Sequence, residues 1–186
     1  MIKLNLGCGN NQLDGYLNVD NQPNFQPDLV VDLEHIPWPF ESNSVSEVVI
    51  SHVLEHLGET TEIYLGIIKE LYRVCANAAK VFISVPHPRH DEFLIDPTHI
   101  RPILPDQFYM FSKKSNREWT SMGLANSQFA DYLEVDFDVV NTKWIPADKW
   151  LAKLKSGEVN SEDLVELATH QFNIIKQIDI ELVVIK

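Results

Sequence analysis

Two glycines separated by one residue follow the first apolar stretch of the chain. Gly7 and Gly9 come directly after residues 2–6, where we expect a buried strand to enter a tight turn. Glycine lets the backbone approach a ligand closely and adopt conformations that other residues resist. The turn is therefore a candidate ligand site, although a single Gly-x-Gly is also found at ordinary strand ends.

Two aspartates end the next two short apolar stretches. Asp20 follows residues 16–19 and Asp32 follows residues 29–31. A carboxylate accepts two hydrogen bonds from the vicinal hydroxyls of a ribose, so Asp20 is predicted to bind a ribose and Asp32 the adenine amino group beyond it. The alternative is that each is an ordinary loop aspartate after a strand.

Histidines gather after two later apolar stretches, residues 48–51 and 81–85. The five concerned are His52, His56, His87, His90 and His99. A histidine with a pKa near neutrality is the usual proton acceptor for a hydroxyl. His52 is the first candidate base because of its place directly after a strand, and His99 is the second. The alternative is that each of these histidines is an ordinary polar residue in a loop.

Residues 52–56 also match the H-x-x-E-H pattern of one class of zinc hydrolases. Two histidines four apart on a helix can bind one zinc ion, with Glu55 between them. Here His52 directly follows an apolar strand, so that His52 and His56 need not share a helix. We therefore predict no bound metal and keep a zinc-dependent hydrolase using His52, Glu55 and His56 as an alternative.

The elements that must position these residues alternate between strands and one clear helix. The expected strands are residues 2–6, 16–19, 29–31, 48–51 and 81–85. Residues 60–75 carry apolar side chains at helical spacing, and a strand, helix and strand in this order imply a parallel pair and an α/β sheet. Residues 132–140 and 175–185 alternate with a period of two and are expected to pair as an antiparallel hairpin.

Composition favours a single domain that works in the cytoplasm. The chain has 186 residues, 45% of them hydrophobic, and no apolar run approaching the roughly 20 residues that span a bilayer. Cys8 and Cys75 are too few for a disulfide framework. The net charge of −12 disfavours binding to nucleic acid or to anionic membranes.

The ordered set of motifs resembles the class I S-adenosylmethionine-dependent methyltransferases, and within them the methyltransferase type 11 group. The matching pieces are LNLGCG (residues 4–9), NVD (18–20), DL (32–33), PWPF (37–40), NSV (43–45), SHVLEHL (51–57), ELYRV (70–74) and ISVP (83–86). The match covers roughly residues 2–111. Residues 96–102 (DPTHIRP) also resemble a segment that recurs in this group.

The resemblance implies a Rossmann-like three-layer sandwich, with a mostly parallel seven-stranded sheet and an antiparallel last strand. It implies S-adenosyl-L-methionine as cofactor, bound by Gly7, Cys8, Gly9, Asp20, Asp32 and Leu33. Residues 7–15 are too short for a usual crossover helix, so we expect trimmed N-terminal helices. Residues 86–131 are expected to form a cap on the substrate side.

Methyl transfer by direct displacement, to a small-molecule or saccharide acceptor, is the function that the sequence favours. A dinucleotide-dependent oxidoreductase fits less well, because position 12 is Gln where the third glycine of that motif stands. A module that binds the cofactor without catalysis stays open as an alternative.

Overall fold

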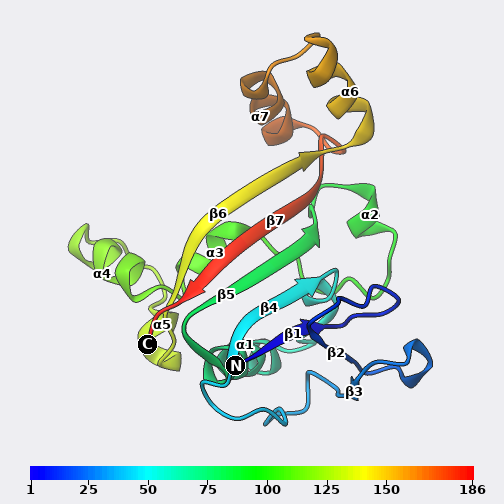
Figure 1. Ribbon diagram of the computed structural model, residues 1–186. Helices are drawn as coiled ribbons and strands as arrows, with labels where there is room; N and C mark the ends of the chain where they lie inside the picture. The colour runs from blue at the N-terminus through cyan, green and yellow to red at the C-terminus, as the bar shows by residue number, and fades with distance from the viewer.

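The computed structural model describes residues 1–186 and contains one seven-stranded sheet (Figure 1). The strands are β1 (Ile2–Leu6), β2 (Leu17–Asp20), β3 (Leu29–Val30), β4 (Val45–Ser51), β5 (Cys75–Pro86), β6 (Phe137–Pro146) and β7 (Ile175–Val184), in the order β3-β2-β1-β4-β5-β7-β6. The first five pair in parallel, while β7 is antiparallel to both β5 and β6. The predicted mostly parallel sheet with an antiparallel last strand is confirmed.

The N-terminal crossovers are trimmed, as the short spacings predicted. No helix separates β1 from β2, and only a short 3-10 helix, η1 (Pro23–Phe25), lies between β2 and β3. The full-length helix of the parallel region is α1 (Thr61–Val74), which links β4 to β5. Helical cover of the sheet is therefore uneven.

The strands alternate between fully buried and half-buried residues. On β5, Val81, Ile83 and Val85 are buried while Phe82 and Ser84 are partly exposed. The same alternation continues on β4 and β7. In the view of Figure 1, α1 and α3 (Pro105–Tyr109) lie behind the sheet, and they cover the buried face. The opposite face is less covered because the N-terminal helices are trimmed.

Helix α1 forms where the apolar spacing predicted it. The side chain of Thr60 accepts a hydrogen bond from the amide of Ile63 and caps the first turn. Ile67, Leu71 and Val74 are buried in the main core. Burying each such side chain contributes about 1.5–3 kcal/mol, so packing rather than propensity holds the helix on the sheet.

The first strand of the C-terminal hairpin begins later in the sequence than predicted. Tyr132 and Leu133 belong to helix α5 (Phe129–Leu133), which ends at Glu134 in the left-handed conformation (φ 58°), and β6 begins at Phe137. The period-two reading of residues 132–140 was wrong at this end, because a helical turn also brings Leu133 into the core.

The β6–β7 hairpin carries two helices on its far end. Helices α6 (Asp148–Ser156) and α7 (Ser161–His170) project beyond the rest of the molecule (Figure 1). A capping box between Asn160 and Asp163 begins α7, and Leu164 packs with Ile174 and Ile175 in a small separate cluster. The remaining helices are α2 (Asp91–Leu94) and α4 (Lys113–Ser121). No helix is both long and apolar enough to cross a membrane.

Candidate functional site

The residues singled out from the sequence meet at the carboxyl edge of the sheet. Strand β1 lies between β2 and β4, so the Gly7–Gly9 turn after β1 is flanked by Asp20 at the end of β2 and by His52 after β4. The chain moves from β1 towards β3 on one side and returns to β4 on the other. This reversal is the position at which open α/β sheets bind ligands.

The turn after β1 is fixed to the end of β2 by two hydrogen bonds. The amide of Cys8 donates to the carbonyl of Val19 at 3.0 Å, and the amide of Gly9 donates to Oδ2 of Asp20 at 2.8 Å. Oδ1 of Asp20 accepts from the amide of Gln22 at 2.9 Å. The carboxylate is buried, and each oxygen keeps a lone pair for a further donor such as a ribose hydroxyl.

Glycine is required at the two positions of the turn for different structural reasons. Both have positive φ, +66° at Gly7 and +47° at Gly9. A Cβ on Gly7 would stand 2.3 Å from Cγ2 of Val53, so the turn after β1 packs directly on the turn after β4. A Cβ on Gly9 would have nothing within 4 Å. The backbone at Gly9 is therefore open to a ligand, whereas Gly7 lets the two turns come together.

A pair of buried asparagines supports the loop that replaces the first crossover helix. Nδ2 of Asn5 donates to Oδ1 of Asn18 at 2.9 Å, and the same Oδ1 accepts from the amide of Leu13 at 2.8 Å. The amide of Asn18 donates to Oδ2 of Asp28 at 2.7 Å. The sequence analysis did not predict this network. The sequence does contain a feature that could have revealed it, because each of two apolar strands has an asparagine inside it.

Asp32 and Leu33 follow the edge strand β3 in the sequence. They therefore lie farther from the Gly7–Gly9 turn than Asp20 does. Asp32 accepts a hydrogen bond from the amide of Glu34 at 3.0 Å, and its Oδ2 lies 2.7 Å from Nδ1 of the exposed His35. The side chain of Leu33 is buried in the core. The carbonyl of Leu33 accepts a hydrogen bond from Nε1 of Trp38 at 2.9 Å, while the half-exposed Asp32 carboxylate stays accessible.

His52 occupies a strained position at the end of β4. Its φ is +56°, which costs a non-glycine residue energy, and its amide donates to the carbonyl of Ser84 at 2.8 Å. The side chain is half-exposed. Nε2 lies 3.2 Å from Oε1 of Gln177, and Nδ1 lies 3.4 Å from Oε1 of Glu55, where the two groups can form an ion pair. The interaction with Glu55 raises the pKa of His52, against the effect of burial.

His99 lies in a more enclosed position than His52. Its side chain is 9% exposed and stacks on Phe93 with a centroid distance of 5.3 Å. Nδ1 lies 2.9 Å from the carbonyl oxygen of Phe93, and Nε2 lies 4.0 Å from Oε1 of Glu55. The structure thus brings His99 beside Glu55 and His56, a grouping that the sequence analysis did not predict.

The geometry does not support the zinc-hydrolase arrangement of residues 52–56. Only Leu54–His56 form a short 3-10 helix, η2, and His52 stands outside it in the left-handed conformation. The two histidines therefore do not sit one turn apart on a regular helix, which is the geometry that this motif requires.

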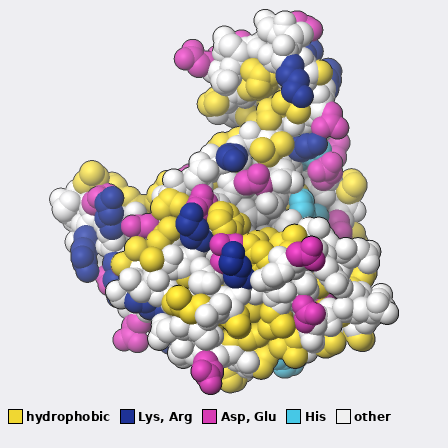
Figure 2. All heavy atoms as spheres, viewed as in Figure 1, with side chains coloured by type: hydrophobic (Ala, Val, Ile, Leu, Met, Phe, Trp, Pro, Cys, Tyr) yellow, Lys and Arg dark blue, Asp and Glu magenta, His cyan; other side chains and the backbone are white.

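A cavity of about 550 Å³ opens beside the carboxyl edge. The loop after β5 and the start of α3 form one side of the cavity, and the β6–β7 hairpin and α7 form the other. The lining residues are His87, Pro88, Arg89, Leu104, Asp106, Trp144, Val165, Ala168, Thr169 and Ile175. Figure 2 shows the surface hollowed beneath the projecting helices, with histidine side chains exposed there. Its size and mixed lining suit a small organic ligand.

His87 is the titratable group of this cavity with the largest pKa change. Burial lowers its pKa to about 4, and the charges of Arg89 and His90 act in the same direction. Nδ1 of His87 accepts a hydrogen bond from the amide of Arg89 at 3.0 Å. The imidazole is therefore neutral at physiological pH, with Nδ1 as the acceptor.

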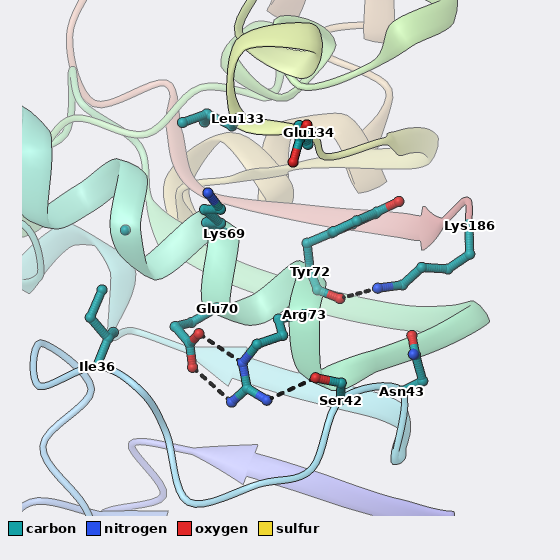
Figure 3. Close-up of a pocket in the computed structure, with 11 residues that line it drawn as sticks. Ile36, Ser42, Asn43, Lys69, Glu70, Tyr72, Arg73, Leu133, Glu134 and Lys186 are labelled. Atoms are coloured by element: carbon teal, nitrogen blue, oxygen red, sulfur yellow. Dashed lines mark hydrogen bonds and ion pairs between the residues drawn. The ribbon is translucent and has the colours of Figure 1, made fainter.

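A second cavity, of about 350 Å³, lies at the opposite edge of the sheet (Figure 3). Its walls include the end of α1, Asn43 before β4 and Lys186 after β7. Nε of Arg73 pairs with Oε1 of Glu70 at 2.8 Å, and Nζ of Lys186 donates to the carbonyl of Tyr72 at 2.7 Å. These charged groups already have partners, and the cavity is remote from the Gly7–Gly9 turn.

The predicted cap of residues 86–131 divides between the two edges. Residues 96–101 lie against η2 at the carboxyl edge, because the amides of Ile100 and Arg101 both donate to the carbonyl of Glu55. In contrast, the amide of Phe137, at the start of β6, donates to the carbonyl of Phe111, and α4 and α5 lie at that end of the hairpin (Figure 1). The segment that can cover the site is thus shorter than predicted.

Several solved structures with the same architecture are methyltransferases. An S-adenosylmethionine-dependent methyltransferase from Archaeoglobus fulgidus superposes with a TM-score of 0.65 at 18% identity, over 97% of this chain and 85% of that one. The 1,6-didemethyltoxoflavin-N1-methyltransferase from Burkholderia thailandensis, solved with S-adenosylhomocysteine, gives 0.53 at 8% identity, over 100% and 71%.

The chain has the class I methyltransferase fold. The predicted Rossmann-like α/β architecture is thereby confirmed. The [4+2]-cyclase SpnF also has this fold, with a TM-score of 0.55 at 13% identity over 97% of this chain and 74% of that one, so the fold by itself does not fix the reaction. No protein-family model matches the sequence, and neither does any curated protein.

Proposed function

We propose that the chain is an S-adenosylmethionine-dependent methyltransferase that binds its cofactor over the Gly7–Gly9 turn. The observation that carries the proposal is the hydrogen bond from the amide of Gly9 to the buried carboxylate of Asp20, at the point where the strand order reverses. That contact holds an open backbone segment next to two free carboxylate lone pairs. These are the groups that a nucleoside with vicinal hydroxyls needs.

The acceptor is proposed to be a small molecule or a saccharide bound in the cavity between β5 and α7. Trp144 contributes an aromatic ring that is 46% exposed, and its centroid is 5.6 Å from that of His87. An exposed indole beside a few polar groups provides a surface on which a flat ring or a sugar ring can stack. The acidic surface of the protein argues against a nucleic-acid acceptor.

Catalysis in this arrangement consists mainly of alignment. The acceptor atom attacks the sulfonium methyl group in line with the carbon–sulfur bond, and S-adenosylhomocysteine leaves with the bonding electron pair. The contribution of the protein is to hold the two reactants in this geometry and to exclude water. Residues 86–104, the part of the cap that reaches the carboxyl edge, are proposed to close over the acceptor.

His52 is the proposed base if the acceptor is a hydroxyl. It lies beside the Gly7–Gly9 turn, its imidazole is half-exposed, and Gln177 and Glu55 orient it from two sides. His99, the second candidate, is less suited because its side chain is only 9% exposed. Geometry therefore favours His52 as the group that receives the proton.

Two measurements test the proposal. Calorimetry with S-adenosylmethionine and with S-adenosylhomocysteine should show one site per chain, and no heat from folded protein would reject it. A methyl-transfer screen with labelled cofactor against fractionated cell extract should then reveal the acceptor. Tight cofactor binding with no labelled product in any fraction would support the alternative of a non-catalytic binding module.

A further inference from the structure

Three potential metal ligands converge from two separate segments of the chain. Glu55 and His56 come from η2, and His99 comes from the loop after α2. One ligand atom from each lies within 4.8 Å of those of the other two. The rings of His56 and His99 are in edge contact, with a centroid distance of 4.6 Å.

The carboxylate of Glu55 is the unusual member of this group. The residue is 0% exposed, and neither Oε1 nor Oε2 has a hydrogen-bond partner. A buried carboxylate is costly unless a cation or hydrogen-bond donors compensate it, and unpaired groups of this kind are rare in native proteins. Its nearest basic groups are two imidazole nitrogens, Nδ1 of His52 at 3.4 Å and Nε2 of His99 at 4.0 Å from Oε1. A bound cation would compensate the carboxylate more fully than these imidazoles do.

Both histidines have one nitrogen engaged and the other free. Nδ1 of His99 lies 2.9 Å from the carbonyl of Phe93, which can only accept, so Nδ1 carries the proton and Nε2 keeps its lone pair. Nδ1 of His56 lies 2.9 Å from Oγ1 of Thr98, whose hydroxyl donates to Asp96 at 2.6 Å. That hydroxyl accepts from Nδ1 of His56, which leaves Nε2 of His56 free as well.

This is the arrangement that orients histidines as metal ligands. In metal sites the second ring nitrogen typically donates to a carbonyl, a carboxylate or another fixed acceptor, which sets the tautomer and the ring plane. The backbone also fixes the two segments to each other, because the amides of Ile100 and Arg101 donate to the carbonyl of Glu55 at 3.0 and 3.1 Å. Nη2 of Arg101 donates to the carbonyl of Gly58 at 2.6 Å.

We propose that Glu55, His56 and His99 bind a divalent transition-metal ion of the zinc type. Two imidazoles and one carboxylate form a known ligand set for zinc, with bonds of about 2.0–2.2 Å. His99 Nε2 and Glu55 Oε1, now 4.0 Å apart, need to approach by less than about 1 Å to share such an ion. Three protein ligands leave a fourth position for water or for an oxygen of a bound molecule.

This proposal replaces the prediction of no metal and differs from the zinc-hydrolase hypothesis in one ligand. That hypothesis used His52, which points to Glu55 but is also held by Gln177. The third ligand here is His99, which is distant in sequence from residues 52–56. The site does not depend on methyl transfer, so it can be tested without an acceptor or a cofactor.

Metal binding is measured on full-length protein that has been stripped with a chelator. Titration with Zn²⁺ should show one ion bound per chain, and Co²⁺ should give the visible absorption of a coordinated ion. His56→Ala and His99→Ala should each lower the affinity by roughly 100-fold or more, because each removes a ligand. Circular dichroism and thermal unfolding on the same samples show whether the variants remain folded.

Two control variants separate binding at this site from binding at other histidines. His170→Ala removes an exposed histidine at the end of α7 and should leave binding unchanged. His52→Ala should retain the ion, whereas the zinc-hydrolase arrangement requires its loss. A wild-type protein that binds no ion at micromolar concentration, or a folded His99→Ala protein that binds as tightly as wild type, overturns the proposal. Neither result would bear on cofactor binding.

The contact between Thr98 and His56 offers a milder test. Thr98→Val removes the hydroxyl that accepts from Nδ1 of His56 and keeps the volume of the side chain. The expected result is a loss of metal affinity of roughly 10-fold or more with no change in stoichiometry. Unchanged affinity would contradict the proposed orientation of His56.

Discussion

The amide of Gly9 lies 2.8 Å from Oδ2 of Asp20, and this bond joins the turn after β1 to the end of β2. It does so without a crossover helix between the two strands. Elsewhere in open α/β folds a helix N-terminus supports the ligand at this position. Here the turn is held instead by hydrogen bonds from the amide of Gly9 to the Asp20 carboxylate and from the amide of Cys8 to the carbonyl of Val19.

Asp20→Ala should weaken binding of S-adenosylmethionine by about 1.5–3 kcal/mol, since a hydrogen bond to a charged group is lost. This corresponds to a rise in Kd of roughly 10- to 150-fold. Calorimetry measures it, with Asp131→Asn as a control because Asp131 is exposed on α5. Equal affinity in a folded Asp20→Ala protein would remove Asp20 from the site.

Gly9→Val should abolish cofactor binding while the protein remains folded. The new side chain meets no protein atom near its Cβ, so its cost to folding is the strain of a positive φ, about 1–3 kcal/mol. The branched side chain would instead occupy the space proposed for the ligand. Thermal unfolding and calorimetry on one sample distinguish the two effects, and retained binding would contradict the proposed position of the cofactor.

Gly7→Ala should destabilise the protein by about 2–4 kcal/mol, because strain adds to a clash with Val53. Val53→Ala removes the two methyl groups nearest to the new Cβ. In a double-mutant cycle the pair should therefore cost less than the sum of the single variants, by about 1 kcal/mol or more. Additive costs, measured by urea unfolding, would show that the two turns do not press on each other.

His52→Ala should lower turnover by roughly 100-fold or more and leave cofactor affinity unchanged, if the acceptor is a hydroxyl. The matched control is His170→Ala, which should show wild-type turnover. Single-turnover rates with the acceptor found in the screen provide the measurement. Full activity in His52→Ala would mean that alignment is sufficient or that the acceptor arrives deprotonated.

His87 should make the protein less stable as the pH falls from about 6.5 to about 4. Its pKa is about 4 in the folded protein and 6.5 ordinarily, so the unfolded chain takes up a proton that the folded protein excludes. The loss amounts to at most about 3 kcal/mol and is absent above pH 6.5. His87→Asn keeps an acceptor for the amide of Arg89 but does not titrate, so its unfolding free energy should depend less on pH in this range. Identical pH profiles would refute the assignment.

The sequence by itself determined where the parallel strands end and which residues stand at those ends. Short apolar stretches that stop at Gly7, Asp20 and His52 predict strands and turns, because burial and backbone freedom are local properties of residue types. The helix over residues 60–75 followed from its apolar spacing in the same way. The missing crossovers followed from spacings too short to hold a helix.

Only the tertiary structure decided which of these residues meet. Spacing alone gave residues 52–56 as a possible metal motif, but the left-handed turn at His52 takes that side chain off the 3-10 helix. His99 reaches Glu55 because the backbone of Ile100 and Arg101 binds across to η2, a long-range contact that no local pattern encodes. The start of β6 was missed for a related reason, since both a strand and a helical turn can bury Leu133, and packing selects between them.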